Sequence, residues 1–229
     1  MNPPSLAAGN SEFAQQLMTR VWASYACCHS YMDEGEVSIV FITGDERRTV
    51  TRPFSTVFVR PSDFRFEFRD RYRDDLPWNR HIVWQSGKSV LTWWHIRPDV
   101  VSKPTLSRAL GGAAGVSGGS ATRIPSLLMP DTLNGTGFSS FTHWKVMGEE
   151  TMGNATAYKV YGIGSSYEGQ DGRLHKRELT LWIDTQTLLI LQTFATRQFE
   201  DFETENTKTY RPQMNIAVPP HKLHFSAPT

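Results

Sequence analysis

The sequence has few of the residues that support disulfide or metal-based structure. Its only two cysteines, Cys27 and Cys28, are neighbours, and adjacent Cα atoms lie about 3.8 Å apart, which is too close for an unstrained disulfide. We interpret both as small apolar residues of a helix. His221 and His224 could meet on one helical face, but no third ligand is suggested, so a metal site is not expected.

Long apolar runs and an excess of either charge are also missing. No stretch of about 18 apolar residues occurs, so no membrane-spanning helix is predicted. Lys plus Arg number 24 against 23 Asp plus Glu, which gives a formal net charge of +1. This balance argues against nucleic-acid binding, because a basic excess is needed to neutralise phosphates. It also argues against a membrane protein held by electrostatics alone.

The first ten residues, MNPPSLAAGN, lack the charged start and the apolar middle of a signal peptide. Two alternatives follow from this. The protein is cytoplasmic if the chain is complete, or periplasmic if an export signal has been removed.

Motifs of common enzyme classes are missing as well. No G-x-S-x-G elbow is present, and no glycine-rich loop leads from a strand into a helix as nucleotide binding requires. The mixed charges of residues 69–75 are expected to form a solvated loop and not a pair of catalytic carboxylates. We therefore expect a non-enzymatic protein without a cofactor.

Aromatic residues, in contrast, are abundant, with seven Trp and 13 Phe. In residues 64–69, FRFEFR, phenylalanines and charged residues alternate strictly. Successive side chains of a strand point to opposite faces, so Phe64, Phe66 and Phe68 should share one face. That face could belong to a filled core or line a cavity for an apolar ligand, and both alternatives stay open.

The hydrophobic periodicity predicts one long helix followed mainly by strands. Apolar residues at four-residue spacing indicate an amphipathic helix over residues 11–31. From Gly35 the period changes to two, and Ser86-Gly87 has the composition of a hairpin turn. Nine or ten antiparallel strands are expected, a number that tends to curl a sheet. The predicted strands and hairpin cover residues 35–43, 49–59, 64–72, 80–96, 141–152, 155–166, 174–184, 188–201 and 205–218.

The segment 97–131 departs from this strand pattern. Pro104 suits the first turn of a helix over residues 105–116, with Ser102 as its N-cap. The glycine-rich stretch that follows is interpreted as a hinge or flap, with a long surface connection as the alternative. A short apolar helix then carries Ile124, Leu127, Leu128 and Met129.

Three short motifs, taken in order, resemble the outer-membrane lipoprotein carrier family (LolA/LolB-like) and its relatives. The resemblance covers most of the chain. The matching residues are Arg60-Pro61 with Phe64 and Phe66, Gly87-Lys88 with Leu91 and Trp93 or Trp94, and Leu223-His224-Phe225 with Pro228.

The resemblance implies a single α+β domain over residues 1–229. Its fold would be an incomplete antiparallel β-barrel of about 10 or 11 strands, with an N-terminal helix and a helical lid around an apolar cavity. The implied function is non-enzymatic binding or carriage of lipid or lipoprotein acyl chains in the bacterial envelope. The implied partners are the lipid, a membrane protein or lipoprotein, and the membrane surface. The alternative is an envelope sensor or regulatory module of the same fold that binds a protein partner.

In the carrier, the arginine of the Arg-Pro pair points into the cavity and hydrogen-bonds the lid helices, and Arg60 is the matching residue. The other expected ligand-binding residues are apolar. Which of them face inward depends on strand register, since a slip of one residue exchanges the faces. They are Phe58, Phe64, Phe66, Phe68, Trp84, Leu91, Trp93, Leu127, Leu128, Met129 and Trp182.

Overall fold

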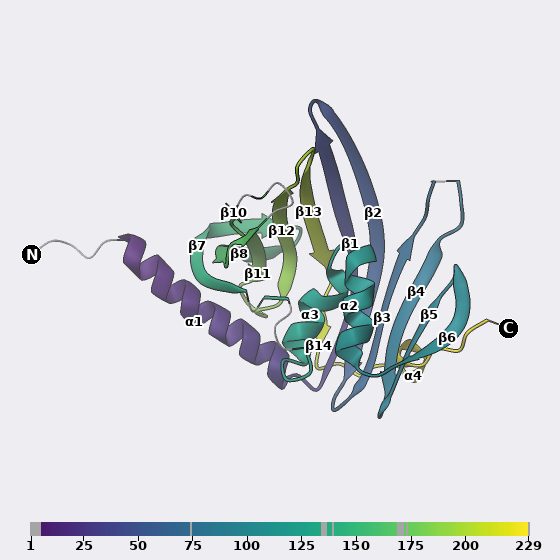
Figure 1. Ribbon diagram of the computed structural model, residues 1–229. Helices are drawn as coiled ribbons and strands as arrows, with labels where there is room; N and C mark the ends of the chain where they lie inside the picture. The colour runs from purple at the N-terminus through teal and green to yellow at the C-terminus, as the bar shows by residue number, and fades with distance from the viewer. Residues whose placement is uncertain are drawn as a thin grey trace, which may run out of the picture. The chain divides into compact units, whose positions relative to one another are not determined.

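The computed structural model describes residues 6–73, 75–133, 137–138, 140–168, 172 and 174–228, with side chains from residue 11 onward (Figure 1). The described chain has an α+β architecture with four helices and a large antiparallel sheet. It divides into two compact units, each described separately below. Unit 1 comprises Met1–Tyr25, Ser38–Val50 and Phe138–Thr209, and unit 2 comprises Ala26–Val37, Thr51–Gly137 and Tyr210–Thr229. The prediction of a single domain stays a prediction.

The main sheet contains 12 strands and is open. The strand order is β6-β5-β4-β3-β2-β1-β13-β12-β11-β8-β7, and β14 pairs with β1. The order begins at β6 and ends at β7, so the predicted incomplete barrel is confirmed, with more strands than expected. The strands are β1 Ser30–Thr43, β2 Glu46–Val59, β3 Asp63–Asp70, β4 Asn79–Ser86, β5 Ser89–Trp94, β6 Arg97–Lys103, β7 Phe141–Met152, β8 Ala155–Gly164, β11 Glu178–Asp184, β12 Ile190–Gln198, β13 Glu203–Tyr210 and β14 Gln213–Met214. A second sheet pairs β9 (Tyr167–Glu168) with β10 (Leu174–His175).

In unit 1, helix α1 (Leu6–Cys27) packs on the sheet through aromatic contacts. The Phe13 ring lies 5.6 Å from the Tyr158 ring of β8. Trp22 contacts Trp144 of β7 at 6.1 Å. The backbone amide of Ile190 donates to the Tyr25 hydroxyl. Through these contacts, the apolar side of the helix that the sequence predicted packs against the sheet of unit 1.

The helix ends four residues earlier than its predicted boundary at residue 31. Strand β1 already begins at Ser30, whose hydroxyl donates to the Ile216 carbonyl. Tyr31 and Met32 pair with Met214 and Gln213 of β14. Because β14 is about 180 residues away in the chain, the local helical pattern gave no sign of this pairing.

In unit 2, the segment after β5 forms a strand that the sequence did not indicate. Residues 97–103 form β6, which pairs with β5, for example Val90 with Lys103. Ser102 is therefore a strand residue and not the expected N-cap. Thr105 is the cap of α2 (Leu106–Val116), and its hydroxyl accepts a hydrogen bond from the Arg108 amide at 3.2 Å.

The glycine-rich stretch is folded as helix and turn. Gly111, Gly112 and Gly115 lie within α2. Gly118 and Gly119 have φ angles of 61° and 83° and connect α2 to α3 (Ser120–Leu128). The left-handed φ angles explain why glycine occupies this short connection.

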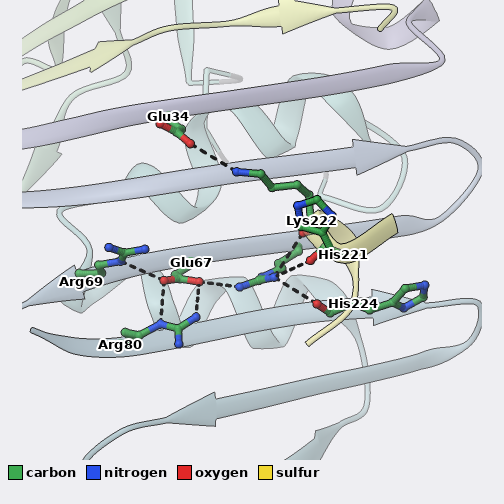
Figure 2. A network of polar contacts seen from close by, with 8 residues as sticks. Glu34, Glu67, Arg69, Arg80, His221, Lys222 and His224 are labelled. Carbon is green, nitrogen blue, oxygen red and sulfur yellow. Dashed lines mark hydrogen bonds and ion pairs between the residues drawn. The ribbon is translucent and has the colours of Figure 1, made fainter. Parts of the chain in front are cut away.

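Helices lie on both faces of the β3–β6 part of the sheet in unit 2. Helix α2 contacts β4, β5 and β6, and the short helix α4 (Pro220–Leu223) contacts β3. The α2 and α3 helices lie behind the strands when α4 is in front (Figure 2). Within the described residues, no helix is both long and apolar enough to cross a membrane.

Candidate functional site

The alternating strand predicted at residues 64–69 is β3, and its phenylalanine face is fully buried. Phe58 of β2 pairs with Phe64, which places both side chains on the same face. Phe58, Phe64, Phe66 and Phe68 are each no more than 1% exposed. We call the face that carries these four residues the aromatic face.

Ring contacts connect the aromatic face to neighbouring elements. Phe66 lies 6.3 Å from both Phe54 and Phe68, measured between ring centroids. Phe54 in turn contacts Tyr210 of β13 at 5.5 Å. The rings of Phe68, Phe66, Phe54 and Tyr210 therefore form a continuous series of contacts from β3 through β2 to β13.

Arg60 follows β2 at one end of the aromatic face and donates to three backbone carbonyls in two segments of unit 2. Its Nε donates to the Cys28 carbonyl at 2.8 Å, and its Nη2 donates to the Ala26 carbonyl at 2.7 Å. The same Nη2 donates to the carbonyl of Leu128, the last residue of α3, at 3.1 Å. The guanidinium carbon also lies 5.1 Å from the centre of the Phe58 ring.

Arg60 is nevertheless an exposed residue, and not one buried in a cavity as the family resemblance implied. Its hydrogen bonds lie at the edge of the aromatic face. The Cys28 thiol beside it is buried, and burial raises its pKa although the Arg60 charge acts in the opposite direction. A neutral thiol is therefore expected at this position.

The other end of the aromatic face is polar. His81 of β4 pairs with Phe68 on one side and with Trp94 of β5 on the other. Arg52 and Asp70 lie two residues beyond the paired Phe54 and Phe68, so they point to the same face. We call Arg52, Asp70, His81 and Trp94 the polar row.

Each residue of the polar row has one buried polar atom without a hydrogen-bond partner among the described residues. The atoms are Arg52 Nε, Asp70 Oδ1, His81 Nδ1 and Trp94 Nε1. Leaving such a group without a partner costs about 1–3 kcal/mol. Burial lowers the pKa of His81 to about 4, and the Lys103 charge acts in the same direction, so the imidazole is neutral at pH 7. The row thus offers donors and acceptors to a polar group placed at the end of the aromatic face.

Three of the predicted ligand-binding residues lie on the opposite face of the sheet. Trp84 pairs with Arg65 and with Leu91, and Trp93 pairs with Ile82, so their side chains point away from the phenylalanines. The rings of Trp84 and Trp93 each lie 5.2 Å from the ring of Phe225 in the C-terminal segment. Trp84, Leu91 and Trp93 therefore do not line the same surface as Phe64.

The remaining predicted residues fall in different places. Leu127 and Leu128 belong to α3, and Met129 follows it; all three are buried in unit 2. Trp182 belongs to β11 of unit 1, where its Nε1 donates to Glu150 Oε2 at 2.7 Å. The hydrogen bonds from Lys159 and Trp182 lower the pKa of the Glu150 carboxyl. Trp182 thus has a polar partner of its own within unit 1.

The charged residues of β3 form a network on the face opposite the aromatic face (Figure 2). Glu67 is only 4% exposed and accepts hydrogen bonds from Arg65, Arg69 and Arg80. Its burial raises the pKa, but the hydrogen bonds from Arg80 and Arg65 outweigh this and lower the pKa to about 2. The carboxylate is therefore ionised throughout the physiological range.

Arg65 also connects β3 to the C-terminal segment. Its Nη1 donates to the backbone carbonyls of His221, Lys222 and His224 at 3.2–3.5 Å. His221 and His224 thus contribute carbonyl oxygens to this network. No group of three or more metal-ligating residues occurs in the part of the chain that the structure describes.

The polar row was missed by the sequence reasoning. A signal was present, because the sequences RHIVW and TWWHI place His81 and Trp94 beside apolar residues of two predicted strands. Only the register shows that these two residues are neighbours and that His81 lies beside Phe68.

Comparison with known proteins gives fold similarity only. No family model and no curated protein matches the sequence. LprF from Mycobacterium bovis aligns with 96% of this chain and 99% of its own, with 13% identity and a TM-score of 0.50. The lipoprotein LppX from Mycobacterium tuberculosis gives 10% identity, coverage of 89% and 96%, and a TM-score of 0.44. A LolA superfamily protein, NE2245 from Nitrosomonas europaea, gives 11% identity, coverage of 93% and 97%, and a TM-score of 0.35. At these identities the likeness shows the fold and no ligand: the chain shares the fold of LprF, and the predicted α+β fold with an incomplete barrel is confirmed.

Proposed function

We propose that the protein binds or carries the acyl chains of a lipid or lipoprotein without catalysing a reaction. The acyl chain would lie along the aromatic face of β2–β5, and α2 and α3 would cover it as a lid. The observation that carries this proposal is the hydrogen bond of Arg60 to Leu128, because it ties the end of a lid helix to the edge of the aromatic face.

The burial of the aromatic face in this structure is consistent with a closed state. Burying a methylene group is worth about 0.8 kcal/mol, so a chain of 16 carbons could contribute roughly 12 kcal/mol relative to water. The same chain in a membrane is already out of water, so transfer between membrane and protein would run close to balance. A lid then serves to keep the apolar face from solvent when no ligand is bound, since exposed apolar patches promote aggregation.

The two ends of the aromatic face fit an amphiphile better than a pure hydrocarbon. From Phe58 to Arg52 the strand covers six residues, on the order of 20 Å at the usual rise per residue. The polar row at the Arg52 end provides unpaired donors and acceptors for a headgroup. A position in the bacterial envelope, with transient contact to a membrane or a lipoprotein partner, follows from such a ligand.

Binding of a photo-crosslinkable fatty acid, followed by mass spectrometry of the peptides, tests this function directly. We expect crosslinks in peptides of β2, β3 and α3, and native mass spectrometry should detect one bound acyl ligand. The face that carries Trp84 and Trp93 serves as an internal control and should remain unlabelled. If the protein neither retains nor accepts any fatty-acyl ligand, or if labelling is confined to the Trp84 face, the proposal is wrong.

A second function, protein binding by an envelope sensor, is favoured by the edge of the sheet. Strand β6 is the first strand of the sheet order, and all but its last residue are exposed. Val100 and Val101 are 47% and 44% exposed. An exposed edge strand can pair with a strand of a partner. Under this alternative, a lipid-independent complex from an envelope extract would be lost in a Val101→Pro variant, while acyl binding would be retained.

A further inference from the structure

A polar cavity of about 440 Å³ lies on the face of unit 2 opposite the aromatic face. It lies over β1, β2 and β3, and Gly35 and Ser55 are among the residues that line it. The guanidinium groups around Glu67 line one side, and Lys222 of α4 lies on another (Figure 2). We call this cavity the charged-face pocket.

The lining of the charged-face pocket carries more positive than negative charge. Its basic residues are Arg65, Arg69, Arg80, Arg211 and Lys222, and its acidic residues are Asp33, Glu34 and Glu67. Glu67 is shared by three guanidinium groups, so it compensates only one of their charges. Glu34 is matched by Lys222, whose Nζ lies 3.6 Å away.

Asp33 contributes at most one negative charge to this balance, and less as the pH falls below about 7. It is fully buried, and burial raises its pKa to about 7. The carboxyl accepts hydrogen bonds from the Tyr31 hydroxyl and the Thr56 amide, so it is already satisfied within the protein. The pocket therefore keeps an excess of at least two positive charges.

Donor groups with the right geometry for an oxyanion are also present. Arg69 uses only its Nε for Glu67, at 3.0 Å, and its side chain is 52% exposed. Its two terminal amino groups point away from Glu67 in Figure 2. A guanidinium in this position can form two parallel hydrogen bonds to a phosphate. The exposed Arg211 adds a second cation to the lining.

We propose that the charged-face pocket binds an organic phosphate anion, held by Arg69 and Arg211 and stabilised by the surrounding positive charge. The cavity has the size of a small-molecule site and exceeds what an inorganic ion would fill. The phosphate can come from a lipid headgroup or from a soluble phosphate ester, which have this chemistry in common. The inference is independent of acyl binding, because the pocket and the aromatic face lie on opposite sides of the sheet.

Two probes distinguish the sources of the phosphate. Glycerol 3-phosphate is titrated into the protein by calorimetry, and flotation is measured with vesicles of equimolar phosphatidylcholine and phosphatidic acid against vesicles of phosphatidylcholine alone. The test variant is Arg69→Gln/Arg211→Gln. The matched control is Arg20→Gln/Arg48→Gln, which removes two exposed charges in unit 1.

We expect the wild-type protein to bind at least one phosphate probe and the test variant to bind it at least about tenfold more weakly, since charge-assisted hydrogen bonds are lost. The control should bind as the wild type does. Binding to the anionic vesicles alone assigns the site to a lipid headgroup, and binding to glycerol 3-phosphate assigns it to a soluble ester. If the wild type binds neither probe, or if the control weakens binding as much as the test variant, the proposal is wrong. Binding of the fatty acid should be equal in all three proteins, so failure of this proposal is separable from failure of the proposed function.

Discussion

The Nη2 of Arg60 lies 3.1 Å from the backbone carbonyl oxygen of Leu128, the residue that ends α3. The same guanidinium donates to the carbonyls of Ala26, in the last turn of α1, and of Cys28, which follows α1. One side chain therefore ties the end of α3 to the end of α1 and the residue that follows it. Because Arg60 is exposed, these hydrogen bonds can be exchanged for water, as a lid requires.

Replacing Arg60 by leucine should make acyl ligands exchange faster. The substitution removes the bond to Leu128, and a hydrogen bond to a charged group contributes about 1.5–3 kcal/mol. Because Arg60 is exposed to solvent, we expect the loss to be near the lower value, about 1.5 kcal/mol. This corresponds to about a tenfold increase in the dissociation rate of the ligand. Stopped-flow displacement of a fluorescent fatty acid measures this rate. Arg48→Leu is the exposed control, and equal rates in Arg60→Leu and wild type would show that Arg60 does not hold a lid.

Phe66 decides whether the aromatic face is tightly packed. Its side chain is fully buried between Phe54 and Phe68. If the surrounding side chains fill the space, Phe66→Ala should lower the free energy of unfolding by about 3–5 kcal/mol. Urea denaturation gives this value, and Phe13→Ala, at a position that is 41% exposed, is the control. A cost no greater than that of the control would indicate that Phe66 borders open space.

The C-terminal segment should shield two tryptophans of unit 2 from solvent. The Phe225 ring packs against Trp84 and Trp93 on the face of the sheet opposite the aromatic face. We expect Phe225→Ala to lower the free energy of unfolding by about 1–3 kcal/mol and to make tryptophan fluorescence more accessible to acrylamide. His224→Ala is the control, because the exposed His224 bonds to Arg65 only through its backbone carbonyl. Unchanged quenching in Phe225→Ala would contradict the packing of this segment.

The elements that the sequence predicted well are those whose periodicity is local. The long helix and the Gly87 hairpin follow from neighbouring residues, and the hairpin forms with Gly87 at a φ of 56°. Strand β6 was missed because six of its seven residues are exposed, which leaves no alternation of buried and exposed side chains. Its existence depends on pairing with β5, which local pattern does not report.

The candidate site was predictable only in part, because strand pairing is not visible in the local sequence pattern. The alternation of Phe64, Phe66 and Phe68 identified one face correctly within its own strand. Assigning Trp84 and Trp93 to that face required the register between strands, and a shift of one residue reverses the assignment. Registers depend on contacts across the whole sheet, so residues from different strands could not be brought together from sequence alone.

Asp33 should make the stability of the protein depend on pH. Burial raises its pKa from 3.8 to about 7 in the folded protein, although hydrogen bonds from Tyr31 and Thr56 favour the charged form. The folded state therefore holds a proton that the unfolded chain has already released between pH 4 and pH 7. The contribution of Asp33 to stability is complete below about pH 4 and is lost as the pH rises to about 7.

The Asp33→Asn variant separates this effect from other titrations. Asparagine stays neutral and can still accept from the Thr56 amide, so its stability should exceed that of the wild type by an amount that grows between pH 4 and pH 7. The gain should reach a few kcal/mol, since each pKa unit corresponds to about 1.4 kcal/mol. Urea denaturation at a series of pH values measures it, and the exposed Asp45→Asn variant should follow the wild-type curve. Parallel curves for Asp33→Asn and wild type would show that Asp33 does not bind this proton.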